Sequence, residues 1–136
     1  MIGFIYKIQN GNNLYIGSTT QTLRNRTNKH NYKLRKDIYK YKLYEFCREH
    51  NITNVILTEI EELEIENKKD LHIVEQKYMD FFKPNLNERL AYRSKERRLI
   101  YDRIRHKAET KCPDCNKCMR KDSIVRHRKV CPNIIQ

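Results

Sequence analysis

The sequence predicts an α+β fold: a small three-stranded antiparallel sheet flanked by helices, followed by a basic helix and a small cysteine-rich module. Two runs of β-branched and aromatic residues flank an Asn-Gly pair near the start of the chain, which is the pattern of a β-hairpin. Later segments repeat apolar residues at helical spacing. Four of the five cysteines lie within the last 25 residues, which indicates a second unit of different chemistry.

The first two strands are predicted at residues 4–8 and 14–16, joined by a type I′ turn at 10–11. This turn would place Tyr6 directly opposite Tyr15 on one face of the sheet. Because side chains alternate between the two faces, a slip of one residue would carry every side chain to the wrong face.

The remaining elements follow from apolar spacing, capping residues and β-branched content. A run of hydroxyl residues at 18–22 is typical of a helix N-cap, and Pro84 marks a helix end. The last predicted helix has too few apolar residues for a buried face, so we expect it to be exposed. The predicted elements are helices over about 23–34, 37–50, 67–82 and 90–108, and a third strand over about 55–60.

The charge of the chain favours a polyanionic partner, most often nucleic acid. Its 136 residues carry a net charge of +12, and 38% of them are hydrophobic and 34% charged. The net charge is +7 over residues 1–50, −4 over 51–90 and +9 over 91–136. We expect three parts, which are a compact domain at 1–88, a basic helical linker at 89–110 and a small module at 111–133.

Neither a membrane segment nor a secretory leader is expected. No stretch approaches the ~20 apolar residues that a membrane helix needs. The N-terminal residues lack the charged start and the long apolar run of a signal peptide. The sequence therefore predicts an intracellular protein without membrane contact.

A carboxylate stands in an unexpected place on the third predicted helix. Glu75 lies between Leu71 and Tyr78, on or beside the apolar face. A carboxylate there is costly unless it meets a metal ion, a cation or hydrogen-bond donors. An edge position open to water, or an ion pair with Arg26, would also satisfy it. The apolar face is expected to comprise Leu71, Val74, Tyr78, Phe81 and Phe82.

Four motifs, taken in chain order, resemble the GIY-YIG nuclease family over about residues 2–88. They are Phe-Ile-Tyr at 4–6, Tyr-Ile-Gly at 15–17, an arginine and a histidine four residues apart on the first helix, and Glu75 ahead of Pro-Asn-Leu-Asn at 84–87. The chain departs from the family at the start of the first tripeptide, where glycine is usual and phenylalanine stands. Its hairpin is also shorter, with eight residues between the tripeptides.

The resemblance implies a role for each matched residue. Gly17 and Asn87 are expected to contact the substrate, with Asn85 as the alternative match to the family's asparagine. The residues implied to be catalytic are Tyr6, Tyr15, Arg26, His30 and Glu75, the last as the ligand of Mg²⁺ or Mn²⁺.

These residue types suit phosphodiester hydrolysis. A hard divalent cation takes oxygen ligands such as the Glu75 carboxylate, and it would stabilise the scissile phosphate and the leaving 3′ oxygen. The Arg26 guanidinium would bind a non-bridging phosphate oxygen. Either Tyr6 or His30 would take the proton of the attacking water, and the sequence leaves this choice open. The resemblance implies cleavage of DNA to 5′-phosphate and 3′-hydroxyl ends.

The cysteine-rich module has the spacing of a zinc site. Cys112, Cys115, His127 and Cys131 form the pattern C-x₂-C-x₁₁-H-x₃-C, which resembles a C₂HC variant of the zinc finger. Zn²⁺ would supply the stability that so short a segment cannot obtain from its own core. Cys118 forms a second C-x₂-C pair with Cys115 and is an alternative ligand. Disulfides are the competing interpretation, and they suit an intracellular chain less well.

A basic track runs through the linker and the module. Clusters of this kind suit phosphate contacts, which give affinity without specifying sequence. The module would otherwise serve as a spacing element or contact a protein. The residues expected to bind DNA are Arg97, Arg98, Arg103, Arg105, Lys107, Arg126 and Arg128.

The sequence therefore predicts a divalent-metal-dependent DNA endonuclease whose zinc finger assists DNA binding. It resembles homing or mobile-element nucleases of phage, large DNA viruses or bacteria, which implies action in the cytoplasm or nucleoid, or in the host cell of a virus or phage. The alternatives are a non-catalytic nucleic-acid-binding module and a nuclease selective for junctions or flaps. No oligomeric state follows from the sequence.

Overall fold

The computed structural model describes residues 1–107, 109–120 and 123–131. The chain forms two compact units, Met1–Tyr92 and a second that begins at Arg93. The predicted division into three parts stays a prediction. Residue 108 of the predicted linker and residues 121–122 and 132–133 of the predicted module lie outside the described residues.

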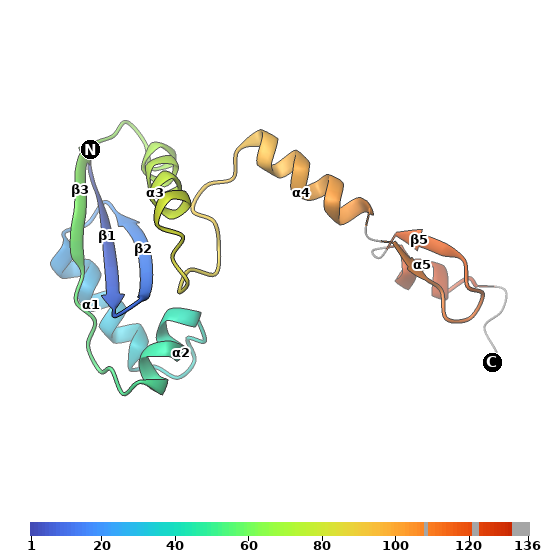
Figure 1. The fold of residues 1–136 in the computed structure, drawn as a ribbon, viewed down its shortest axis with the longest axis horizontal. Coiled ribbons are helices and arrows are strands. Elements are labelled where there is room, and N and C mark those ends of the chain that lie inside the picture. The colour runs from blue at the N-terminus through green and yellow to red at the C-terminus, as the bar shows by residue number, and fades with distance from the viewer. Residues whose placement is uncertain (108, 121–122, 132–136) are drawn as a thin grey trace. The chain divides into compact units, whose positions relative to one another are not determined.

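The sheet of the first unit has three antiparallel strands in the order β2-β1-β3 (Figure 1). Its strands are β1 (Ile2–Asn10), β2 (Asn13–Thr19) and β3 (Thr58–Glu64). The predicted three-stranded antiparallel sheet is thus confirmed, although β3 begins three residues later than expected. Strand β2 is an edge strand, so its outer backbone groups need partners from outside the sheet.

The register of the hairpin differs from the prediction by two residues. The turn holds Gly11 and Asn12 rather than the predicted Asn-Gly pair, so Tyr6 lies opposite Gly17 instead of Tyr15. Gly11 has a φ of 57°, and a glycine with positive φ at the first central position is typical of a type II′ turn. Because the register shifts by an even number of residues, Tyr6 and Tyr15 still lie on the same face of the sheet, with ring centroids 6.4 Å apart.

Three helices flank the sheet. Thr22 caps the first by accepting a hydrogen bond from the backbone N–H of Asn25, as the run of hydroxyl residues predicts. The second begins five residues later than predicted, because Arg48 donates to carbonyl groups of the preceding loop, including those of Lys36 and Tyr39. The helices are α1 (Leu23–Leu34), α2 (Lys42–Glu49) and α3 (Lys68–Phe82).

The two faces of the sheet bury separate apolar cores. Tyr6 and Ile8 pack on one face with buried residues of α1 and α2. Ile5 and Ile16 pack on the opposite face with buried residues of α3. Because neighbouring residues of a strand point to opposite faces, Ile5 and Tyr6 are both fully buried although they are adjacent.

Helix α3 buries less of its apolar face than the sequence predicts. Leu71 is buried and Val74 and Tyr78 are half-buried, but Phe81 and Phe82 are 79% and 43% exposed. Phe82 packs beside the rings of Tyr78 and Phe81 instead of against the sheet. The last turn of the helix therefore presents aromatic rings to solvent.

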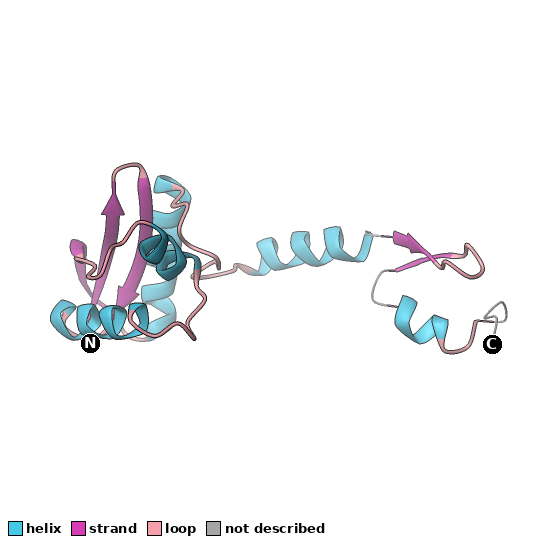
Figure 2. Cartoon of the chain, turned by 90° about the horizontal axis from the view of Figure 1, so that it is seen from below, coloured by secondary structure: helices cyan, strands magenta, loops and turns pink. Residues whose placement is uncertain are grey.

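The second unit consists of a basic helix, a short hairpin and a final short helix (Figure 2). As predicted from its few apolar residues, the basic helix exposes Leu99, Ile100 and Ile104. No helix in the part of the chain that the structure describes has both the length and the apolar character needed to span a membrane. The elements are α4 (Lys95–Lys107), β4 (Glu109–Lys111), β5 (Cys118–Arg120) and α5 (Ile124–Arg128).

The substitution Gly17→Ala is expected to destabilise the first unit. A Cβ at this position would lie 2.6 Å from Cζ and from the hydroxyl oxygen of Tyr6. Because Tyr6 is fully buried, its ring cannot move away, and the expected loss is about 1–3 kcal/mol of unfolding free energy. Urea unfolding followed by circular dichroism measures the loss.

The matched control is Asn12→Ala, at the exposed second position of the same turn. Asn12 is not among the residues with positive φ, so alanine fits its backbone without strain. Equal unfolding midpoints for the Gly17→Ala and Asn12→Ala proteins would contradict the proposed need for glycine opposite Tyr6.

Candidate functional site

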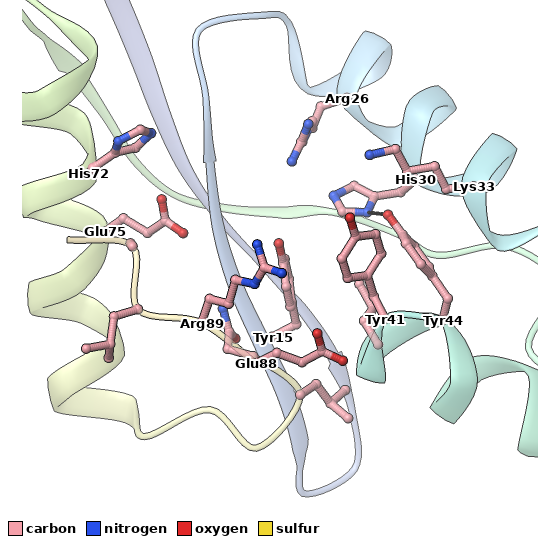
Figure 3. Close-up of a pocket in the computed structure, with 15 residues that line it drawn as sticks. Tyr15, Arg26, His30, Lys33, Tyr41, Tyr44, His72, Glu75, Glu88 and Arg89 are labelled. Carbon is pink, nitrogen blue, oxygen red and sulfur yellow. Dashed lines mark hydrogen bonds between the residues drawn. The ribbon is translucent and has the colours of Figure 1, made fainter. Parts of the chain in front are cut away.

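A cavity of about 320 Å³ lies beside the edge strand β2, where elements from the two faces of the sheet approach each other. Figure 3 shows α1 on one side of it, α3 on the other, and the segment with Glu88 and Arg89 between them. Helix α2 adds tyrosine side chains to the wall. Five residues singled out in the sequence line this cavity, namely Tyr15, Arg26, His30, Glu75 and Asn87.

Tyr6 is fully buried and joins the lining residues through its hydroxyl group. The Nε–H of Arg26 donates to the Tyr6 hydroxyl oxygen at 2.9 Å, and His30 Nε2 lies 2.8 Å from the same oxygen. His30 Nδ1 lies 3.0 Å from the hydroxyl oxygen of Tyr44, which lines the cavity. The four side chains form one hydrogen-bonded chain that links α1, β1 and α2.

Of these four hydrogen-bonded side chains, Arg26 is charged, and burial keeps the other three in their neutral forms. It raises the pKa of Tyr6 and of Tyr15 above the usual value, an effect that the Arg26 charge opposes, and it raises the pKa of Tyr44 to about 12. Burial, reinforced by the charge of Arg26, lowers the pKa of His30 to about 3. At neutral pH His30 is therefore an uncharged imidazole with one donor and one acceptor nitrogen.

Glu75 reaches the cavity from α3 and is held by strand β2. The Ser18 hydroxyl donates to Glu75 Oε2 at 2.5 Å. Burial raises the pKa of the Glu75 carboxyl, while the Ser18 hydrogen bond and the influence of His72 and Arg26 oppose that shift. The partner of Glu75 is thus Ser18, whereas Arg26 binds Tyr6. A partly buried carboxylate at a cavity wall is the hard oxygen ligand that Mg²⁺ or Mn²⁺ prefers, so these residues fit a divalent cation.

The segment after α3 pairs with the free edge of β2. Asn87 Oδ1 accepts a hydrogen bond from the Ile16 N–H at 2.9 Å, and its Nδ2 donates to the Ile16 carbonyl at 2.7 Å. Asn85 Oδ1 accepts from the Leu14 N–H at 2.8 Å. Both asparagines therefore act as strand partners, and Gly17 makes room for the Tyr6 ring. Substrate contact by Asn87 and Gly17 stays a prediction.

The sequence did not indicate Ser18, Tyr44 or His72 as residues of the site. Ser18 lies on the face of β2 toward α3, and His72 precedes Glu75 by one turn of α3. Strand alternation and helix spacing would have indicated both residues. Tyr44 carries no local signal, because its hydrogen bond to His30 joins two different helices.

The cavity carries more basic than acidic side chains. Of its two acidic residues, Glu88 accepts a hydrogen bond at 2.6 Å from the backbone N–H of Lys42, at the start of α2. Glu75 faces the cavity (Figure 3). This balance of charge suits an anionic ligand such as a phosphate group. The basic and histidine residues that line the cavity are Arg26, His30, Lys33, His72 and Arg89.

In the second unit, Cys112, Cys115, His127 and Cys131 come together, and their ligand atoms all lie within 4.8 Å of one another. The Sγ atoms of Cys112 and Cys131 are 3.9 Å apart. Two thiolates bound to one tetrahedral Zn²⁺ at about 2.3 Å would be about 3.8 Å apart. Cys118 is exposed in β5 and lies outside this group. The donor set and its spacing therefore fit a structural zinc ion.

The basic residues expected to bind DNA lie on the two helices of the second unit. Lys107 is the last residue of α4. Arg128 also lies 3.6 Å from a carboxylate oxygen of Asp114. Contact of these residues with phosphate stays a prediction. The exposed ones are Arg97, Arg98, Arg103 and Arg105 of α4, and Arg126 and Arg128 of α5.

Lowering the pH from 7 to 4.5 is expected to destabilise the first unit through His30. Its pKa of about 3 in the folded protein lies below the ordinary 6.5, so between these values the unfolded chain binds a proton that the folded chain does not. The contribution of His30 is therefore complete above pH 6.5 and falls as the pH decreases toward 3. The loss at pH 4.5 is roughly 2–3 kcal/mol.

Urea unfolding of the wild type and of His30→Gln at both pH values isolates this contribution. Glu75 has a raised pKa and acts in the opposite direction, but it is common to both proteins. A pH dependence that is the same in the two proteins would show that His30 is not held neutral.

A comparison with protein families concerns the first unit. The family model described as the GIY-YIG catalytic domain matches residues 2–89. A protein of Invertebrate iridescent virus 6, described as containing an MSV199 domain, is 33% identical over 82 residues. This match covers 57% of the chain and 32% of the viral protein, so the chain spans about a third of that relative. No solved structure matches the chain. From its tripeptides, its helical glutamate and the match of its first unit, the chain belongs to the GIY-YIG catalytic domain family.

Proposed function

We propose that this protein is a DNA endonuclease that hydrolyses phosphodiester bonds with the help of one divalent cation, Mg²⁺ or Mn²⁺. It leaves 5′-phosphate and 3′-hydroxyl ends. Membership of the GIY-YIG family supports nuclease activity in general. The observation that carries the proposal is the meeting of Tyr15, Arg26 and Glu75 at one cavity, although they come from a strand and two helices far apart in the chain.

Arg26 and Glu75 have separate roles in the proposed reaction. Arg26 binds a non-bridging oxygen of the scissile phosphate with its terminal nitrogens, since its Nε–H is engaged by Tyr6. Glu75 holds the divalent cation, which when bound supplies positive charge to the phosphate and to the leaving 3′ oxygen. Ser18 keeps the Glu75 carboxylate in place.

The proton of the attacking water goes to Tyr6 or to His30. The two side chains share a hydrogen bond of 2.8 Å, so they act as one unit whichever receives the proton first. Tyr15, whose ring lies 6.4 Å from that of Tyr6, forms the cavity wall that the substrate meets.

The second unit supports DNA as the substrate class. Its Cys₃His group suits a structural Zn²⁺, and the two helices of this unit expose several arginines. Phosphate contacts of this kind give affinity that weakens with salt. An intracellular setting, including the host cell of a virus or phage, fits because reducing conditions keep thiols available for zinc. A homing or mobile-element role is part of the same proposal.

Plasmid cleavage tests the proposed activity. The full chain with Mg²⁺ should convert supercoiled plasmid to nicked or linear DNA. Glu75→Gln should slow this conversion by roughly 100-fold or more, because it removes the charge that holds the cation. Glu66→Gln is the matched control, since Glu66 is an exposed acid just before α3 and its loss should leave the rate unchanged.

Two outcomes would overturn the leading proposal in different ways. If the wild type binds DNA but cleaves none of the tested sequences with any of the metal ions, the protein is a non-catalytic binding module. Cleavage confined to junctions or flaps, included as parallel substrates, would show a structure-selective nuclease.

Zinc removal is expected to unfold the small module and to weaken DNA binding, while the first unit keeps part of its activity. The module depends on the metal because it has few buried apolar residues. Cys112→Ser should lose the zinc, and Cys118→Ser is its control because Cys118 lies outside the ligand group. Zinc content and fluorescence anisotropy with labelled duplex DNA measure both effects. Full DNA binding by the zinc-free protein would contradict this role.

A further inference from the structure

We propose that Tyr44 is a positioning residue of the site: its hydroxyl oxygen accepts the Nδ1 proton of His30 and so keeps His30 Nε2 unprotonated toward Tyr6. The inference rests on the proposed function, because it concerns where the proton of the attacking water goes. It gives a residue of α2, a helix that otherwise only lines the cavity, a role beside the residues of the sheet, α1 and α3.

The position of His30 lets it contact two hydroxyl groups at once. His30 is only 3% exposed. Its Nε2 lies 2.8 Å from the Tyr6 hydroxyl oxygen and its Nδ1 lies 3.0 Å from that of Tyr44. A neutral imidazole has one proton for its two nitrogens, so one of these hydroxyl groups accepts a hydrogen bond from the ring and the other donates to it.

The surroundings of Tyr6 decide which nitrogen carries the proton. The Tyr6 oxygen already accepts the Nε–H of Arg26 at 2.9 Å, and a guanidinium does not give up its proton at neutral pH. If His30 Nε2 also donated to this oxygen, the proton of the fully buried Tyr6 would have to turn to the Tyr15 hydroxyl and away from its 2.8 Å contact with His30. When Tyr6 donates to an unprotonated Nε2, the Tyr6 hydroxyl has both a donor partner, Arg26, and an acceptor partner, His30.

Tyr44 is suited to accept the other ring proton. Its side chain is 5% exposed and lines the cavity, so its own O–H can donate to water there. Burial raises the pKa of Tyr44 to about 12, so it remains a hydroxyl group at neutral pH. It therefore orients His30 without adding a negative charge near Arg26.

This tautomer gives the proton of the attacking water a place to go. As the water proton passes to the Tyr6 oxygen, the Tyr6 proton passes to His30 Nε2. The imidazolium that results donates from Nε2 to Tyr6 and from Nδ1 to Tyr44, and it forms only while a bound phosphate offsets the Arg26 charge that helps keep His30 neutral in the free protein. One proton enters and one leaves Tyr6, so the phenol stays neutral. The arrangement has the logic of a reacting group, a base and a third group that orients the base.

The substitution Tyr44→Phe removes the hydroxyl group and keeps the ring. In the zinc-loaded full chain, we expect the kcat of plasmid cleavage to fall by about 10- to 100-fold with little change in KM. Tyr39→Phe is the matched control, since Tyr39 is a partly buried tyrosine that packs against the same core and takes no part in the proposed site. Thermal melting of both variants reports whether the fold is intact.

Nitrogen-15 NMR of the His30 ring tests the tautomer without relying on activity. The His30 signals are assigned by their loss in His30→Gln. At pH 7.5 the wild type should show a protonated Nδ1 and an unprotonated Nε2, and Tyr44→Phe should shift the ring toward a mixture of tautomers.

A wild-type ring protonated at Nε2 would overturn the proposal, whatever the cleavage assay shows. It would also be overturned if Tyr44→Phe kept both the wild-type tautomer and a kcat within about twofold of the wild type. Failure of the wild type to cleave DNA would instead refute the proposed nuclease function, while the NMR measurement still decides the role of Tyr44.

Discussion

The need to satisfy the buried hydroxyl group of Tyr6 organises this site. A phenol without solvent contact requires both a donor and an acceptor inside the protein. Arg26 and His30 stand one turn apart on α1, and both reach the Tyr6 oxygen within 3 Å. Their hydrogen bonds set how α1 is turned against the sheet. The same contacts aim a guanidinium and an imidazole at the cavity, so packing and site geometry have one cause.

The second constraint is that β2 is an edge strand. With β1 in the centre and β2 at the edge of the described sheet, residues on the two faces of the sheet can meet around that edge. Tyr15 faces α1, whereas Ser18 faces α3 and binds Glu75. A further strand beside β2 would separate the two sides. The segment at 85–87 closes the open backbone instead, chiefly through asparagine side chains, and leaves room for the cavity.

The two units depend on different sources of stability. The first has apolar cores on both faces of its sheet. Their stability offsets the free-energy cost of burying the hydrogen-bonded polar side chains between the sheet and two helices. The described part of the second unit shows few buried side chains, and two of them are Cys112 and Cys131 of the Cys₃His group. Metal binding is the physical means by which so small a module becomes ordered. The arginines of α4 and α5 are exposed at the surface instead of packed in a core.

The sequence by itself determined the element types of the first unit, their order, the family and most of the candidate residues. Each of these depends on local features: the caps and apolar spacing of α1, the two tripeptides, and the spacing of Cys112, Cys115, His127 and Cys131. Local patterns of this kind survive folding because neighbours along the chain remain neighbours in space.

Only the tertiary structure decided the contacts between distant residues. The hairpin shifted by two residues and placed glycine, not tyrosine, opposite Tyr6. Helix α2 starts late because Arg48 holds the carbonyl groups before it. Ser18 meets Glu75 and Tyr44 meets His30 across elements that no spacing rule connects. Such partners are chosen by shape and by the need to satisfy buried polar groups, and both exist only once the chain is folded.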